Sequence, residues 1–202
     1  MENVINLLRE SDALQEGHFL LSSGRHSDKY FQCAKLLQYP DKAQAAFEAV
    51  VQKIIDDIKS GKLKIDIVAG PAMGGIIAAW EVARQLGIHG FNFPSMFTER
   101  DENGVMTIRR GFEIKNGQNV LIVEDVVTTG KSSRECAASL EAAGAKIAAL
   151  ACVVDRRSEN SGDIPWPFYP AIKLTAANWD ISQCELCKKG IPLVKPGSRK
   201  IS

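Results

Sequence analysis

The chain lacks the features that characterise membrane, fibrous and nucleic-acid-binding proteins. Its longest apolar run, residues 147–154, is far shorter than the roughly 20 residues of a membrane helix. Its 25 basic and 24 acidic residues leave a net charge of +1, so no overall field attracts nucleic acid or an anionic membrane. The chain also has no internal repeat and no low-complexity tract. These absences predict an ordinary globular protein with no nucleic-acid partner and no membrane partner.

Signals for export and for an obvious metal site are absent as well. The amino terminus carries acids where a secretory signal carries bases, and the five cysteines are an odd number, which favours reduced thiols in the cytoplasm. Cys184 and Cys187 form a C-x-x-C, but no second Cys or His pair follows at metal spacing. We therefore expect a plain turn there, unless two copies of the pair meet across a dimer. We expect His18 and His89 to be structural and His26 to lie at the rim of a functional site.

Apolar runs alternate with helical patterns through the middle of the chain. Residues 40–61 have apolar side chains at helical spacing, with a proline and an acid at the start and a glycine at the end. The runs at 64–70, 119–125 and 146–157 are apolar almost throughout, and the first two lead directly into helical patterns. Apolar strands separated by helices predict a doubly wound, mostly parallel α/β sheet that is covered on both faces.

We expect a single domain over residues 1–202, because a chain of this length holds one well-buried core. The core should span about residues 41–157. Residues 1–40 contain short β-type runs broken by Ser-Gly, and residues 158–202 are rich in Pro, Trp and Tyr with weak periodicity. These two end segments should form a small hood over the core.

Two glycine-containing turns, residues 69–75 and 124–132, follow two of the expected strands. Ligands of open parallel sheets bind beyond the carboxyl ends of the strands, so the two turns should share one cleft. The second turn offers consecutive backbone N–H groups, threonine hydroxyls and a helix N-terminus, which suits a phosphate monoester. The alternative is a simple capping turn with Ser or Thr as the N-cap.

Glu124 and Asp125 are adjacent acids at the end of the strand before this turn. Two like charges at a buried strand end repel each other and lose hydration unless a ligand or a cation satisfies them, which a capping turn does not explain. The letters Gly-Lys-Ser also end the P-loop signature, but Asp125 stands where that signature requires its first glycine. Acids for a vicinal diol, followed by amides for a phosphate, predict a site for a ribose 5-phosphate.

The segment VLIVEDVVTTGKS resembles the phosphoribosyl pyrophosphate (PRPP) signature of the type I phosphoribosyltransferases. With FLLSSGRHSDKYFQ, GPAMGG and VVDRR, the chain is similar to the orotate phosphoribosyltransferases over most of its length. This resemblance implies the type I phosphoribosyltransferase fold. It also implies transfer of ribose 5-phosphate from PRPP to orotate, giving orotidine 5'-phosphate and pyrophosphate, with Mg2+ required. It further implies a homodimer in which a loop of one subunit reaches the other subunit's site.

The resemblance assigns the PRPP site to the two turns. Glu124 and Asp125 hold the ribose hydroxyls and act in catalysis, and Asp125 meets the metal indirectly, through PRPP-bound Mg2+. The turn after them wraps the 5-phosphate, and the earlier turn binds pyrophosphate through backbone amides. The complete PRPP-binding set is Glu124, Asp125, Val126, Val127, Thr128, Thr129, Gly130, Lys131, Ser132, Ala72, Met73, Gly74 and Gly75.

The base pocket is assigned to fewer residues. Orotate carries a carboxylate, so its pocket requires an arginine fork and hydrogen-bond partners. Arg156 and Thr128 match the family's orotate-contacting arginine and threonine. The alternative for Arg156 is a surface ion pair with Asp155 or Glu159.

The sequence departs from the family pattern in two places. Many relatives carry a mobile loop with a lysine and a histidine that closes over the reacting centre, and the comparable region, residues 97–112, contains neither. Arg100 and Arg109, with Arg110, are the cations available there to stabilise pyrophosphate as catalytic residues, and a solvated hairpin face is the alternative. The family pattern also has a lysine just before Ser-Gly-Arg, and this sequence has none there, because Ser22 and Ser23 occupy these positions.

Two other functions stay open. The PRPP signature also serves transfer to a purine or another base, although Arg156 favours an acidic pyrimidine. A PRPP-sensing regulator of the same fold would bind RNA or DNA through a basic face or an added domain, against which the net charge of +1 weighs.

Overall fold

The computed structural model describes residues 2–21, 23–158 and 161–196, and within them a six-stranded sheet has the order β5-β4-β3-β6-β7-β8. Every neighbouring pair is parallel except the β4–β5 hairpin. The expected doubly wound, mostly parallel sheet is therefore confirmed. Its strands are β3 (Ile67–Pro71), β4 (Ser95–Arg100), β5 (Met106–Ile108), β6 (Asn119–Val127), β7 (Lys146–Asp155) and β8 (Phe168–Lys173).

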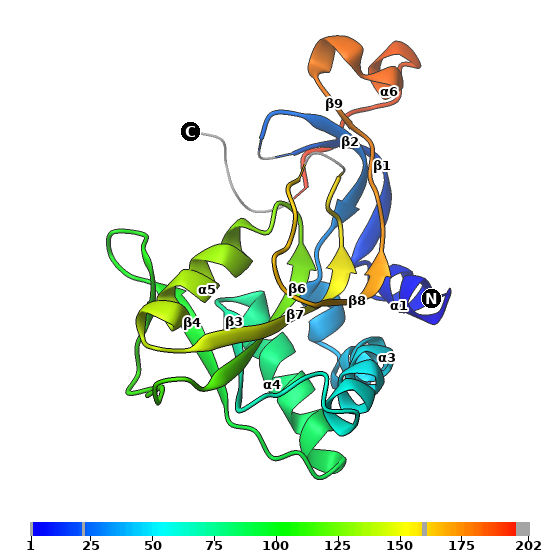
Figure 1. Cartoon of the computed structure of the whole chain (residues 1–202). Helices are drawn as coiled ribbons and strands as arrows, with labels where there is room; N and C mark the ends of the chain where they lie inside the picture. Colours follow the sequence, from blue (N-terminus) through cyan, green and yellow to red (C-terminus); the bar gives the residue numbers. More distant parts are fainter. Residues whose placement is uncertain (1, 22, 159–160, 197–202) are drawn as a thin grey trace.

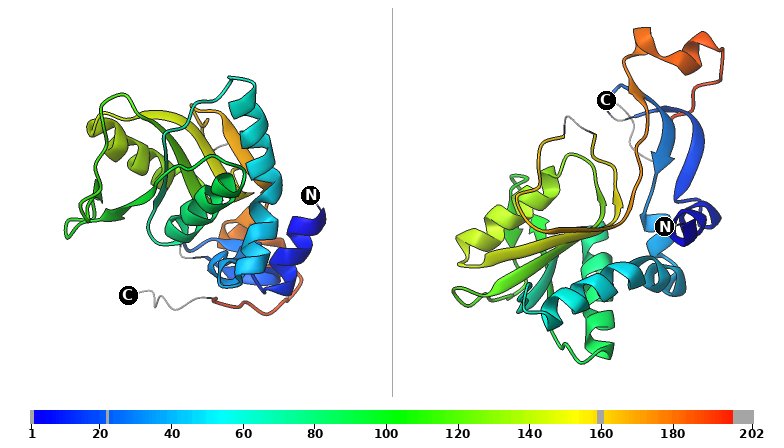
Figure 2. Two further views of the ribbon diagram at one scale, coloured as in Figure 1. Left: turned by 90° about the horizontal axis from the view of Figure 1, so that it is seen from below. Right: turned by 45° about the vertical axis from the view of Figure 1, so that its right-hand side comes forward.

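Helices cover both faces of this sheet (Figure 2). Along β6, Leu121 and Val123 belong to the buried cluster that includes α3 and α4, whereas Val120 and Ile122 belong to the cluster that includes α5. Successive side chains of a strand point to opposite faces, so a strand buried on both sides is apolar throughout. The three helices are α3 (Pro40–Lys59), α4 (Gly74–Ile88) and α5 (Lys131–Ala142).

Helix α3 forms where its end signals predict it. Pro40 occupies its first turn, where a missing N–H costs nothing, and Asp41 and Lys59 complement the helix dipole at its two ends. Its inner face buries Phe47 and Ile54 completely. No helix in the described parts of the chain is long and apolar enough to span a membrane.

The hood is a second, antiparallel sheet in the order β1-β2-β9, and it stands beyond the carboxyl ends of β6, β7 and β8 (Figure 1). Strands β1 and β2 come from the start of the chain, and β9 comes from its C-terminal part. The hood thus joins the two end segments, as expected. The hood comprises β1 (Leu14–Leu20), β2 (His26–Phe31), β9 (Asn178–Trp179), the 3-10 turn η1 (Ile181–Gln183) and α6 (Glu185–Lys188). Two further helices of the first segment, α1 (Glu2–Glu10) and α2 (Ala34–Leu37), pack against α3 of the core.

The expected end of the core at residue 157 is wrong. Strand β8 lies after that point, yet it pairs in parallel with β7 and belongs to the core sheet, with Leu150 opposite Phe168 and Asp155 opposite Lys173. Its sequence, FYPAIK, contains Pro170, which a central strand excludes and an edge strand tolerates. The core therefore continues to Lys173.

Candidate active site

The two adjacent acids lie near the carboxyl end of β6, below the hood. Glu124 is 7% exposed and Asp125 is half-buried. The Ser133 hydroxyl, in the first turn of α5, donates a hydrogen bond to the Glu124 carboxylate. Burial raises the pKa of Glu124 to about 7, although the bond from Ser133 lowers it, and the charge of Asp125 raises it further. Burial also raises the pKa of Asp125.

The turn that follows β3 lies directly against these acids. A Cβ atom placed on Gly74 would stand 2.5–2.6 Å from the carboxyl atoms of Asp125, so a larger residue does not fit there. A Cβ on Gly70 would stand 2.1 Å from the carbonyl oxygen of Gly75, which shows how tightly this turn is folded. The expectation that the two glycine-containing turns share one site is confirmed.

The turn after the acids presents an uncapped helix N-terminus. Gly130 is the N-cap of α5, with φ of +70°, and no side chain caps the helix. The capping alternative, with Ser or Thr as the N-cap, is therefore wrong. Thr128 and Thr129 are exposed, and the Thr129 hydroxyl accepts a bond of 3.3 Å from the Lys131 N–H. The Lys131 N–H thus has a side-chain partner, whereas the next N–H groups of the first turn have no partner inside the helix and suit an anion.

Helix α4 supplies a second N-terminus of the same kind. Its N-cap is Met73, again without a side-chain cap, and Met73 is 81% exposed. The Ala72–Met73 peptide bond is cis, and the Ala72 N–H donates to the Thr98 carbonyl oxygen at 2.7 Å. Two helix N-termini, each the positive end of its dipole, thus flank the acid pair.

Arg156 lies on the other side of β6, where β7 ends. Its guanidinium carbon stands 4.3 Å from the centre of the Phe31 ring, which belongs to hood strand β2. The buried Nε has no hydrogen-bond partner among the described residues, and burial lowers the pKa of the guanidinium. It is Arg157 that pairs with Asp155, at 2.9 Å, so the alternative interpretation, an ion pair between Arg156 and Asp155, is wrong. Glu159, the other candidate partner, lies outside the described residues.

The two arginines expected to act in catalysis are held on the hairpin. Arg100 forms an ion pair with Glu135 of α5 at 2.5 Å and donates to the Gly104 carbonyl oxygen at 2.6 Å. Arg109 lies 3.8 Å from Glu99, which Arg110 contacts more closely, at 2.8 Å. The β4–β5 hairpin lies at the edge of the sheet opposite β8, laterally distant from the hood (Figure 1). Within the described part of the chain, Arg100 and Arg109 thus form hydrogen bonds and ion pairs with the hairpin and α5 and none with the acid pair.

Three contacts at the site lay beyond the sequence expectations. Ser133 follows the signature by one residue and turns inward because it is on the buried face of α5. Phe31 meets Arg156 across 125 positions, and no local signal connects them. The tight packing of Gly70 could have been predicted from the sequence, because this glycine is the first residue of the GPAMGG turn.

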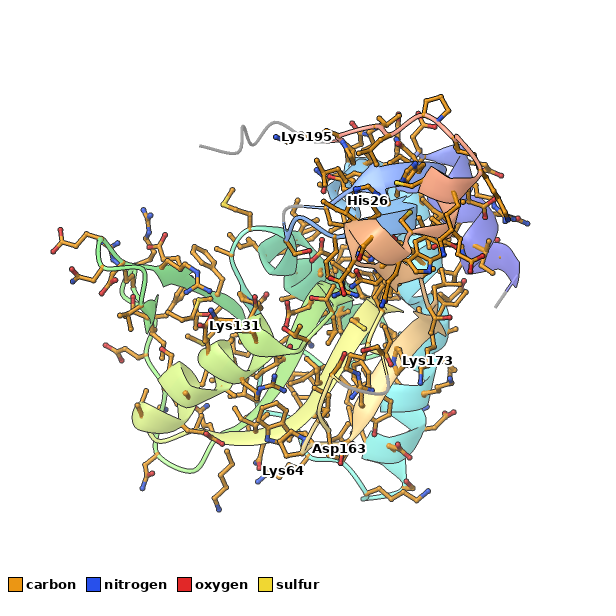
Figure 3. All side chains as sticks on the ribbon, turned by 90° about the horizontal axis from the view of Figure 1, so that it is seen from above. His26, Lys64, Lys131, Asp163, Lys173 and Lys195 are labelled. Carbon is orange, nitrogen blue, oxygen red and sulfur yellow. The ribbon has the colours of Figure 1, made fainter. Side chains whose placement is uncertain are left out.

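The expectation for His26 is wrong. Its side chain is 3% exposed and lies inside the hood, with Nδ1 2.9 Å from Nε2 of His18. Figure 3 shows His26 among the hood segments, apart from Lys131, which marks the N-terminus of α5. The ring points into the hood because β2 alternates its side chains between the two faces of the small sheet. His89, at the C-cap of α4, is exposed.

Comparison with known proteins finds the same family by sequence and by structure. The family model described as "Phosphoribosyl transferase domain" matches residues 41–183. An orotate phosphoribosyltransferase from Caldanaerobacter subterraneus subsp. tengcongensis is 44% identical over 200 residues, which cover 99% of this chain and 98% of the relative.

Two solved structures share the fold. The orotate phosphoribosyltransferase of Aeropyrum pernix superposes with a TM-score of 0.66 at 22% identity, covering 85% of this chain and 93% of that one. The orotate phosphoribosyltransferase of Francisella tularensis superposes with a TM-score of 0.61 at 24% identity, covering 84% of each chain.

Glu124 makes stability depend on pH in a predictable direction. Its pKa is about 7 in the folded chain and 4.5 in the unfolded chain, so the folded state binds the proton more tightly. The stabilising contribution is complete below about pH 4.5 and is lost as the pH rises through about 7, by up to about 3 kcal/mol. Denaturant unfolding across this range should show the free energy of unfolding falling in the wild type and falling less in Glu124→Gln. Parallel pH profiles for the two proteins would contradict the raised pKa.

Proposed function

Because this chain belongs to the phosphoribosyltransferase family, among the orotate phosphoribosyltransferases, we propose that it transfers ribose 5-phosphate from PRPP to orotate. The products are orotidine 5'-phosphate and pyrophosphate, in the synthesis of pyrimidine nucleotides. The observation that carries this proposal is the packing of Gly74 against Asp125, which joins two uncapped helix N-termini to one buried acid pair. PRPP has a phosphate, a diol and a pyrophosphate in the same order.

Each part of PRPP has its own group of residues in this proposal. The Glu124 and Asp125 carboxylates accept hydrogen bonds from the two ribose hydroxyls, which satisfies two acids whose pKa values burial raises. The backbone amides of residues 128–132 bind the 5-phosphate, and those of residues 72–75 bind pyrophosphate. Glycine at position 74 allows the pyrophosphate oxygens to approach the backbone closely.

The acid pair also fits a magnesium ion that arrives with PRPP. Mg2+ prefers hard oxygen ligands and usually takes one or two carboxylates together with substrate phosphates and water. Asp125, half-buried beside Gly74, presents such oxygens at the place where the sugar meets the pyrophosphate turn. When bound, the metal supplies positive charge for the departing pyrophosphate.

The reaction requires a base nitrogen to replace pyrophosphate at the anomeric carbon. The ring nitrogen of orotate forms a bond to that carbon while the carbon–oxygen bond to pyrophosphate breaks. The electron pair of the broken bond leaves with pyrophosphate. The proton of the ring nitrogen passes to pyrophosphate or to water. Positive charge that grows on the sugar lies next to the acid pair, and negative charge that grows on pyrophosphate lies at the α4 N-terminus, so fixed dipoles favour both changes.

Arg156 and Thr128 hold the base in this proposal. Arg156 is half-buried against Phe31, and its buried Nε has no partner among the described residues, so a planar carboxylate can take the donors that the protein leaves free. Thr128 is exposed at the start of the phosphate turn, and its hydroxyl supports the base from the sugar side. A purine lacks the carboxylate that Arg156 would bind, and this favours orotate over the purine alternative.

We further propose that the enzyme is a homodimer in the cytoplasm. Large apolar side chains on one face of α4 are exposed: Met73 81%, Ile77 47%, Trp80 59% and Ile88 66%. They recur at helical spacing, and such a face supports an interface with a second copy. In that dimer, the Arg100 and Arg109 hairpin of one subunit acts on pyrophosphate in the site of the other. The five cysteines, all free thiols in the structure, support a reducing compartment.

Neutralising both acids tests the PRPP site. The double variant Glu124→Gln, Asp125→Asn should weaken binding of Mg-PRPP by more than about 100-fold, because hydrogen bonds to charged groups contribute about 1.5–3 kcal/mol each. Titration calorimetry with Mg2+ and PRPP measures the change, and Glu113→Gln, an exposed acid outside the site, is the control. Unchanged affinity in the double variant would remove the basis of the proposal.

The base assignment is tested with PRPP, Mg2+ and a panel of bases. We expect turnover of orotate and none of adenine or hypoxanthine. Arg156→Gln should raise the KM for orotate at least 10-fold, equivalent to about 1.4 kcal/mol, with little change in the KM for PRPP. Arg157→Gln, which loses the ion pair with Asp155 and the contact with the Phe168 ring but no contact with Phe31, serves as the matched control. Turnover of a purine without orotate would reject the base while leaving the PRPP site intact.

The dimer is tested by a charge on the exposed α4 face. Trp80→Asp should shift the protein from dimer to monomer in sedimentation experiments, because a buried carboxylate at an interface loses its hydration. Its kcat should also fall, since the hairpin would no longer reach a partner's site. Tyr39→Asp, at another exposed aromatic residue, is the control and should stay dimeric. A wild type that sediments as a monomer while active would reject this part of the proposal.

A further inference from the structure

Four side chains from distant parts of the chain meet inside the hood. His18 of β1 and His26 of β2 approach each other, with His18 Nε2 2.9 Å from His26 Nδ1. The Cys184 sulfur lies 3.3 Å from His18 Nε2, and the Cys187 sulfur lies 3.3 Å from His26 Nδ1 and 3.7 Å from His18 Nε2. All four atoms lie within 4.8 Å of one another, and only Cys187 is exposed. The sequence analysis expected no second ligand pair near Cys184 and Cys187, and this expectation is wrong. It missed the two histidines because they lie more than 150 positions away in the sequence.

We propose that these four residues bind one structural Zn2+ ion, a site independent of the function proposed above. A tetrahedral ion with bonds of about 2.0–2.1 Å to nitrogen and about 2.3 Å to sulfur places its ligand atoms about 3.3–3.8 Å apart. The nitrogen–sulfur distances of 3.3, 3.3 and 3.7 Å agree with this spacing, whereas the two nitrogens, at 2.9 Å, lie closer than in a metal-bound site and would separate slightly around the ion. Two imidazoles and two thiolates in this geometry favour zinc over calcium or magnesium.

The orientation of His18 prepares it as a ligand. Its Nδ1 lies 2.8 Å from the Ile191 carbonyl oxygen, which can only accept, so Nδ1 carries the proton and Nε2 presents a lone pair. A ligating histidine typically has its other nitrogen fixed by such an outer partner. The single lone pair on Nε2 faces His26, Cys184 and Cys187, and it can accept only one hydrogen bond well. A cation among the four atoms satisfies all of them together.

The C-terminal part of the hood also has little else to hold it. Neither hydrophobic cluster contains a described residue after Ala176. Four of the large apolar side chains there, at positions 181, 191, 193 and 194, are 40–63% exposed, and Trp179 and Leu186 are only half-buried. Arg25 binds Asn178 and Asp180, and two backbone bonds join Val194 to β1. Small units without a core of their own are commonly stabilised by a metal, because the metal bonds replace missing apolar burial.

The ion therefore joins the C-terminal segment to both strands at the start of the chain. Four protein ligands close its coordination shell, so it serves structure and has no position for a substrate. Strand β2 also carries Phe31, the ring against Arg156, so the metal stabilises the strand that borders the active site. Only the two cysteine ligands were recognisable in the sequence, as the C-x-x-C at Cys184 and Cys187. In the structure, Cys184 is the N-cap of α6.

The test measures metal in the full-length protein, without reference to activity. Protein purified without chelator should contain one zinc per chain by mass spectrometry of the elements. After removal of zinc with a chelator that binds Mg2+ weakly, added Co2+ should produce the visible absorption of a tetrahedral site with sulfur ligands. Removal should also expose residues 177–196 to proteases, and added Zn2+ should restore protection.

Cys187→Ser is the main variant, because this residue is exposed and its replacement removes no packing. The zinc affinity of this variant should fall more than about 100-fold. Loss of a residue that only hydrogen-bonds a metal ligand typically lowers the affinity about 10–100-fold, so the larger loss identifies Cys187 as a ligand. Cys136→Ala, a buried cysteine of α5 outside the cluster, should keep one zinc per chain. His89→Gln is the matched histidine control.

Three outcomes would overturn the proposal. One is wild-type protein that, once folded and reduced, takes up neither Zn2+ nor Co2+. Another is equal zinc affinity in Cys187→Ser and the wild type. The third is a disulfide between Cys184 and Cys187 in protein purified under reducing conditions. Each leaves the PRPP and orotate assignments untouched, because those are tested by ligand binding and turnover.

Discussion

The site depends on two carboxylates that are kept close together and partly dry at the end of the central strand. Burial raises the pKa of both Glu124 and Asp125, and the glycine at position 74 lets Asp125 lie directly against the turn that begins α4. This is an unfavourable place for charge in an empty protein. It becomes favourable when hydroxyl donors and a cation arrive, and two helix N-termini stand ready for the anions that accompany them. In the proposed function, binding and catalysis therefore use the same polar groups that cost stability when no ligand is bound.

The hood completes this arrangement from the two ends of the chain. Its sheet is small, and its last segment adds no side chain to either hydrophobic cluster of the described structure. Directed bonds take the place of apolar burial there: Arg25 with Asn178 and Asp180, backbone bonds at Val194, and the proposed zinc ligands. A hood held by a few strong, local bonds can stay in register above the site while the rest of its surface remains open. The stacking of Arg156 on Phe31 connects this hood to the proposed base pocket.

Local signals predicted the central elements well. Helix α3 has a proline and an acid in its first turn and a lysine in its last turn, which are typical of helix ends. Strands β6 and β7 are apolar almost throughout. In each case, local propensity and burial favour the same structure. Strand β8 was missed because an edge strand with a proline has neither continuous apolarity nor clear alternation. The acids and the glycine-containing turns of the site were identified because they are contiguous in sequence. The environments of Arg156 and His26 were not, since each depends on a partner from another part of the chain.

The amino-acid sequence by itself determined the family, the parallel core and the order of chemical groups along the PRPP signature, because these follow from neighbouring residues and short periods. Only the tertiary structure decided which turn touches which acid, that Arg156 faces an aromatic ring with a free donor, and that two histidines join a distant C-x-x-C. The physical reason is that such contacts are produced by strand register and by the packing of the chain ends, which bring together residues whose separation in sequence carries no information about their distance in space.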